Sequence, residues 1–91
     1  MTLDSSVAIS ENTFTQKIDD EIVLLDTESE EYFGLDASGA VIWHYLSESK
    51  SLRGVYESML AIYDVAPEQL EKDIVTFVQK LADAGLVQLQ A

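Results

Sequence analysis

The chain of 91 residues contains no cysteine, one proline, four glycines and five basic residues. The lack of cysteine excludes disulfides, thiolate metal sites and thiol nucleophiles, and leaves the redox compartment undetermined. Because proline and glycine are scarce and 47% of the residues are hydrophobic, the composition favours one folded domain over disorder. The N-terminus lacks a basic segment, and no apolar run approaches about 18 residues. We therefore expect a cytoplasmic protein that does not associate with membranes.

The shortage of basic residues argues against nucleic-acid binding. Five cations are scattered among 17 acidic residues, for a formal net charge of −12, whereas a phosphate-binding surface needs clustered Lys and Arg. The acids are unevenly placed, because eight carboxylates and no Lys or Arg lie from Asp19 to Asp36. Two interpretations of this acidic run stay open: a solvated face that maintains solubility, or a surface complementary to a basic peptide or enzyme.

Hydrophobic periodicity in the first part of the chain predicts three strands. Asp19-Asp20 supplies a tight turn between the first two, and the polar stretch Thr27–Glu30 separates the second from the third. Consecutive pairing would make an antiparallel meander with the third strand at its edge. Residues 7–10 are a further extended candidate that the pattern does not decide. The three predicted strands are Phe14–Ile18, Glu21–Asp26 and Glu31–Leu35.

The second part of the chain has a helical period and predicts three helices. Asp36 and Ser51 are the expected N-caps of the first two, which end near Ser47 and Asp64, and Pro67 begins the third. The third helix should end in a Schellman motif in which Gly85 takes the left-handed conformation. Residues 87–89 are a second undecided extended piece. The expected core-facing residues are Ala40, Ile42, Trp43 and Leu46, then Leu52, Val55, Met59, Leu60 and Tyr63, then Leu70, Ile74, Phe77, Val78 and Leu81.

This order predicts an α+β domain of winged helix-turn-helix type, in which a three-stranded antiparallel sheet is followed by three helices. Because Leu35 directly precedes Asp36, the first helix must pack on the sheet, with Trp43 as the large anchor of that contact. We expect residues 1–12 to be an N-terminal extension and residues 13–91 to form the domain.

Reactive side chains are too few for a recognisable catalytic centre. His44 is the single histidine and lies off the apolar stripe of its helix, so we expect it at the surface. Zinc and iron sites lack ligands, no glycine-rich loop could hold phosphate, and no acidic pair lies in a calcium-type loop. We therefore expect no enzymatic activity, no cofactor and no metal.

Several segments together resemble the PqqD-like family, whose members are recognition elements for ribosomally made, modified peptides. Asp19-Asp20 and Gly54 depart from the pattern, since the family often has a glycine in the hairpin and an acidic capping residue near the start of the second helix. The resemblance covers nearly the whole chain and depends on order and spacing, without a catalytic signature. The segments that carry it are Ile22–Asp26, Glu31–Asp36, Gly39–Trp43, Pro67–Ile74 and Leu81–Val87.

The resemblance implies that a leader peptide adds a strand to the third strand and settles in a cleft beside the third helix. An exposed strand edge, with its unpaired backbone groups, permits this mode of binding. A separate leader protease or radical-type enzyme would then act on the precursor, with lasso-peptide maturation favoured over pyrroloquinoline quinone assembly.

Two rival interpretations from other functional classes remain. A DNA-binding winged helix is disfavoured because the third helix carries more acids than bases, and a regulatory or structural subunit that binds a protein without a leader peptide stays the alternative. We expect a monomer or weak dimer. The candidate peptide-binding residues, whose core-facing and groove-facing members the sequence does not separate, are Glu30, Glu31, Tyr32, Phe33, Gly34, Leu35, Lys72, Ile74, Val75, Val78 and Gln79.

Overall fold

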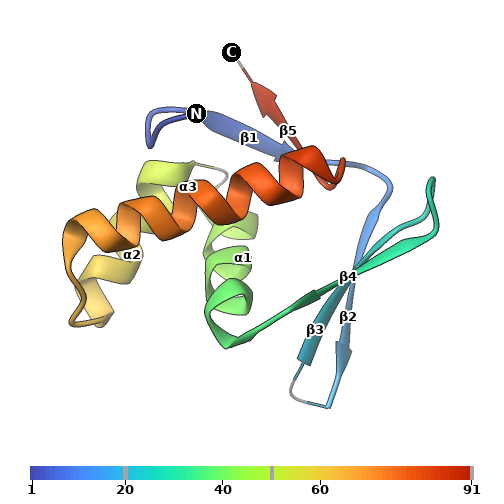
Figure 1. Ribbon diagram of the computed structural model, residues 1–91, viewed down its shortest axis with the longest axis horizontal. Coiled ribbons are helices and arrows are strands. Elements are labelled where there is room, and N and C mark those ends of the chain that lie inside the picture. The colour runs from blue at the N-terminus through green and yellow to red at the C-terminus, as the bar shows by residue number, and fades with distance from the viewer. Residues whose placement is uncertain (20, 50, 91) are drawn as a thin grey trace.

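The computed structural model describes residues 1–19, 21–49 and 51–90 (Figure 1). It confirms the predicted α+β class, with a three-stranded antiparallel sheet followed by three helices. Asp20 of the predicted turn and Ala91 at the end of the predicted domain lie outside the described residues. Among the helices described, none combines the length and hydrophobicity needed to cross a membrane. The elements are β1 Ser6–Ile9, β2 Thr13–Ile18, β3 Glu21–Asp26, β4 Glu31–Leu35, α1 Ala37–Ser49, α2 Leu52–Ile62, α3 Pro67–Asp83 and β5 Val87–Gln90.

Strands β2, β3 and β4 pair in chain order, which places β4 at an edge as predicted. Ile18 is opposite Glu21, and Asp26 is opposite Glu31, so the register follows directly from the two turns. Asp19 has φ 55° and Glu30 has φ 61°. Both turns therefore use the left-handed region, which the aspartate of the first turn tolerates better than the glutamate of the second.

Helix α1 covers one face of this sheet, because β4 leads into it without a linker. Leu24 on β3 and Leu35 on β4 are buried in the common core. Trp43 is 4% exposed, and its Nε1 donates to Thr15 Oγ1 on β2 at 3.3 Å. The indole is thus the predicted anchor between helix and sheet, with its polar atom satisfied.

The predicted helix ends are confirmed at the caps. Asp36 Oδ1 accepts from the Gly39 amide at 2.7 Å, and Ser51 Oγ accepts from the Gly54 amide at 3.3 Å. At the end of α3, the Leu86 amide donates to the Leu81 carbonyl at 2.9 Å. Gly85 has φ 80° there, as a Schellman ending requires. Helix α1 runs two residues past the expected end, and α2 stops two residues short of its own.

The two undecided extended pieces pair with each other. β1 and β5 form a two-stranded antiparallel sheet in which Ser6 is opposite Gln90 and Ile9 is opposite Val87. Leu3 and Val7 are buried in the same core as the helices. The first 12 residues, expected to precede the domain as an extension, therefore contribute a strand and two core side chains to it.

Candidate functional site

The open edge of β4 exposes the backbone of alternate residues. Ile18 and Glu21 close the β2–β3 hairpin across two residues, so they form a hydrogen-bonded pair. Because backbone groups alternate in direction along a strand, the even-numbered residues of β3 direct theirs toward β4. Their partners on β4 are residues 31, 33 and 35. The backbone N–H and C=O groups of Tyr32 and Gly34 consequently point to the open side of β4.

The side chains of β4 divide between two faces. Leu35 is buried and Phe33 packs partly against the core, whereas Tyr32 is 66% exposed on the opposite face. A Cβ added to Gly34 would meet no atom within 4 Å. Glu30 and Glu31 are exposed at the start of the strand. Of the six predicted strand-side residues, Tyr32 and Gly34 therefore offer backbone groups to a partner, and Leu35 belongs to the core.

A groove separates the first turn of α1 from one flank of α3. It has a volume of about 340 Å³ and begins where β4 ends. The family resemblance implied a cleft between β4 and α3, whereas this groove is lined by Asp36 and the first turns of α1 on one side and by α3 on the other. Its lining residues are Asp36, Ser38, Gly39 and Ile42 on the β4–α1 side, and Lys72, Asp73, Thr76, Phe77 and Lys80 on α3.

The structure does not bring all the predicted α3 residues into this groove. Ile74 and Val78 have no exposed surface, so they hold the helix to the core and present nothing to a peptide. Val75 lines a separate hollow together with Met1. Gln79 is exposed and donates to Asp83 along the helix. Of the predicted α3 positions, Lys72 lines the groove.

Four α3 residues that line the groove were not predicted. They follow one flank of the helix, since successive side chains are rotated by about 100° around the axis and the buried stripe lies beside them. The helical period shows which residues share this flank. It does not show which flank of α3 lies toward β4, because that depends on how the helix and the sheet pack. The missed residues are Asp73, Thr76, Phe77 and Lys80.

Two lysines and two aspartates line the groove, so its side chains carry both signs of charge in equal number. Lys72 and Lys80 both line it, and within the described residues neither forms an ion pair shorter than 4.0 Å. The nearby carboxylates already have hydrogen-bond donors. Asp36 accepts from Gly39, and Asp73 accepts from Gln69 Nε2 at 2.8 Å. Within the described residues, the two ammonium groups are therefore available to a carboxylate of a bound chain.

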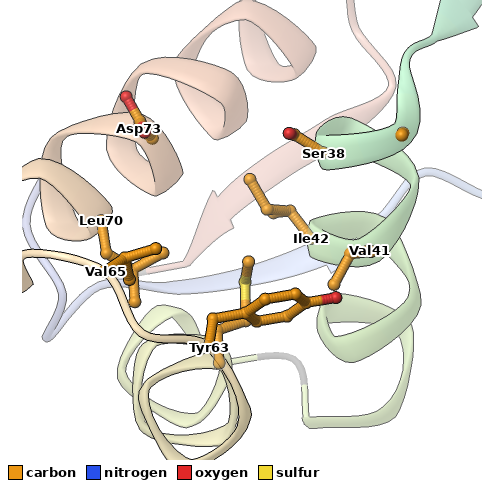
Figure 2. A pocket seen from close by; sticks show the side chains of 9 residues that line it. Ser38, Val41, Ile42, Tyr63, Val65, Leu70 and Asp73 are labelled. Carbon is orange, nitrogen blue, oxygen red and sulfur yellow. The ribbon is translucent and has the colours of Figure 1, made fainter.

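An apolar cavity of about 280 Å³ adjoins the groove between the three helices (Figure 2). Figure 2 shows Ile42 and Tyr63 directed into it from opposite sides. The cavity and the groove share Ser38, Ile42 and Asp73 as lining residues, so they lie next to each other. Tyr63, which we expected in the core stripe of α2, is 42% exposed and lines this cavity instead. The sequence did contain a signal for this cavity. Tyr63 and Val65 are apolar residues in the segment before Pro67, where a connecting loop is normally polar.

His44 lies at the surface, as expected. Its Nε2 atom is 3.4 Å from Glu48 Oε1, and both side chains are more than half exposed. In the described ranges, no three side chains capable of binding a metal come together. The candidate site around β4 therefore consists of the open backbone edge of the strand, the groove and the apolar cavity.

Comparison with known proteins identifies the family. The model of coenzyme PQQ synthesis protein D (PqqD) matches residues 21–87, from β3 to the start of β5. The chain belongs to the PqqD family. This confirms the family that the sequence segments indicated. No curated protein matches the chain at a significant level.

Two solved structures are similar to this PqqD-family chain over most of its length. TbiB1 in complex with the TbiA(β) leader peptide is 38% identical, with a TM-score of 0.81, and the match covers 88% of this chain and 93% of that one. A lasso peptide synthetase B1 complexed with the leader peptide is 26% identical, with a TM-score of 0.82, and the match covers 91% and 98% of the two chains. Both similar structures are thus complexes with leader peptides.

Proposed function

We propose that this protein is a non-catalytic adaptor that binds the leader segment of a ribosomally synthesised precursor peptide and presents it to a separate enzyme. The observation that carries the proposal is the open edge of β4, which leads without a linker into the α1–α3 groove. The likeness to two leader-bound proteins supports it, and their description favours lasso-peptide maturation.

The leader adds one strand to the sheet. Its backbone pairs with the outward N–H and C=O groups of Tyr32 and Gly34, which supplies affinity that depends little on sequence. Specificity comes from the side chains that enter the groove. Lys72 and Lys80 select a carboxylate at that point, and the adjoining cavity selects an apolar side chain.

The adaptor acts by holding substrate near the enzyme. A leader bound at β4 leaves the rest of the precursor tethered, and tethering raises its concentration at an enzyme held by the same adaptor. The alternative, a regulatory or structural subunit without a leader, explains neither the open edge nor its continuity with the groove.

Calorimetric titration with a synthetic leader of the precursor on which this adaptor acts tests the proposal. We expect saturable binding of the synthetic leader, no binding of the core segment alone, and an unchanged precursor mass after incubation with the purified protein. A leader that does not bind would contradict the adaptor role, and cleavage or modification by the protein alone would contradict the absence of catalysis.

A further inference from the structure

The face of the β2–β3–β4 sheet turned away from α1 is mainly apolar and uncovered. Trp43 contacts Thr15, which fixes the covered face, so side-chain alternation assigns the opposite one. Phe14, Ile18 and Tyr32 are 56%, 54% and 66% exposed there. Figure 1 shows the sheet extending to one side of the helices. This outer face consists of Phe14, Gln16, Ile18, Glu21, Val23, Leu25, Tyr32 and Gly34.

Its apolar residues are continuous across the strands. Leu25 on β3 lies directly opposite Phe14 on β2 and Tyr32 on β4, so the three form one row. Val23 is opposite Gly34, where the missing side chain leaves the surface flat. Directly opposed side chains pack against one another, and a contiguous apolar patch on a small domain marks an interaction surface.

Carboxylates lie at both ends of the outer face. Asp19 and Glu21 lie at the β2–β3 turn, and Glu28 and Glu30 lie at the β3–β4 turn. Glu30 borders the apolar row, because it lines a shallow hollow with Leu25 and Tyr32. The outer face as defined contains no Lys or Arg.

This charge pattern decides between possible occupants. Two copies of the chain placed face to face would oppose carboxylate with carboxylate, and an anionic membrane would be repelled in the same way. A protein surface with an apolar centre and flanking Lys or Arg is complementary in both respects.

We propose that the outer face docks the enzyme that processes or modifies the bound precursor, through an apolar contact flanked by basic residues of that enzyme. The inference rests on the proposed adaptor function, which requires a second protein. The leader takes the edge of β4 and the enzyme takes the outer face, so both bind at once to the same sheet. The part of the precursor that follows the bound leader then extends from the adaptor next to the enzyme.

The test uses Phe14→Ser/Ile18→Ser, which changes two exposed residues of β2, on the opposite edge of the sheet from the leader. Leu89→Ser is the matched control, because Leu89 is also a strand residue and is 50% exposed on the β1–β5 sheet. The probes are the purified enzyme that acts on the precursor, whose binding is measured by biolayer interferometry, and the synthetic leader, whose binding is measured by calorimetry. We expect the double variant to lose at least about tenfold in enzyme affinity, because buried aromatic and aliphatic anchors dominate such contacts. Leader affinity should stay within about twofold for both variants, and the control should bind the enzyme like the parent.

Unchanged enzyme affinity in the double variant, or a parent that does not bind the enzyme when loaded with leader, would overturn the docking proposal. A parent dimer that the double variant loses, with enzyme affinity unchanged, would assign the face to a second copy. Failure of the parent to bind the leader would instead contradict the adaptor function, so the two failures are distinguishable.

Discussion

An ideal Cβ built on Gly39 would lie 2.9 Å from Phe77 Cε1, so the ring of Phe77 occupies the space that any other residue at position 39 would need. Gly39 belongs to the first turn of α1, and Phe77 belongs to the flank of α3 that lines the groove. The absence of a side chain at position 39 therefore lets the Phe77 ring of α3 lie against the first turn of α1 at the proposed leader site.

Gly39→Ala should weaken leader binding several-fold with little loss of stability. The added methyl displaces the end of the Phe77 ring into the groove, whereas the better helix propensity of alanine, worth about 1 kcal/mol, offsets part of the cost of overpacking. Calorimetry and thermal unfolding measure the two effects. Phe77→Leu in the alanine background should recover affinity. Unchanged leader affinity in Gly39→Ala alone would mean that Phe77 does not contribute to the leader site.

Proline scanning should separate the two sides of β4. Tyr32→Pro removes an amide that points to the open side, so we expect a native circular dichroism spectrum and at least about tenfold weaker leader binding. Phe33→Pro removes an amide directed at β3 and should instead lower the free energy of unfolding by about 1–3 kcal/mol.

Lys17→Pro is the control for this scan, since its amide points to the open side of β2 at the opposite edge of the sheet. It should bind leader like the parent. A folded Tyr32→Pro with parental affinity would show that β4 is not the receptor strand, and loss of binding in Lys17→Pro would transfer that role to β2.

Neighbouring positions on α3 should respond differently to truncation. Lys80→Ala removes an ammonium group from the groove and should weaken leader binding about two- to tenfold, with a smaller effect at high salt. Gln79→Ala changes an exposed residue outside the groove and should leave affinity unchanged. Calorimetry at two salt concentrations measures both, and equal effects of the two changes would mean that the leader does not follow this flank.

Local signals in the sequence account for most of the fold. The caps at Asp36 and Ser51 and the glycine at Gly85 mark helix ends by chemistry that involves residues within one turn. No local signal announces that β1 pairs with β5, because the partners lie at opposite ends of the chain. That pairing depends on where the C-terminal end of α3 places β5. The packing of the assembled core determines this position.

The α3 side of the candidate site shows the same limit. The strongest apolar period selected Ile74 and Val78, which are the residues that the core buries completely. The groove-lining residues of α3 lie beside this stripe, and the stripe alone does not say which flank lines the groove. The open edge of β4 was easier to predict, since strands that pair in chain order leave the third strand at an edge whatever its side chains are.

Removal of residues 1–12 should destabilise the whole domain. Deletion exposes the core surface that Leu3 and Val7 cover and leaves β5 without its partner. Burial of these two side chains alone contributes about 3–6 kcal/mol, which is a large part of the stability of a small domain. Denaturant titration measures the loss. A truncated chain that unfolds at the parental midpoint would support a domain boundary at residue 12.

Association with the enzyme should slow as salt rises if the acidic residues around the outer face steer a basic partner. Exposed charges are screened beyond about 8 Å at physiological ionic strength, so the effect should fall mainly on the on-rate. Asp19→Asn/Glu21→Gln should flatten the salt dependence and preserve the turn, because asparagine also tolerates the φ of 55° found at position 19. An on-rate that salt does not change would leave these carboxylates with a role in solubility alone.

The pairing of Ser6 with Gln90 brings both ends of the fold out at one place, on the other side of α3 from the β2–β3–β4 sheet in the view of Figure 1. Closely spaced ends of this kind allow a domain to be grafted into a loop of another protein, or to be circularly permuted through a short linker, without strain. A host protein joined at this point would leave the β4 edge and the outer face free. Insertion into a host loop at this point should therefore preserve both of the surfaces proposed to bind partners.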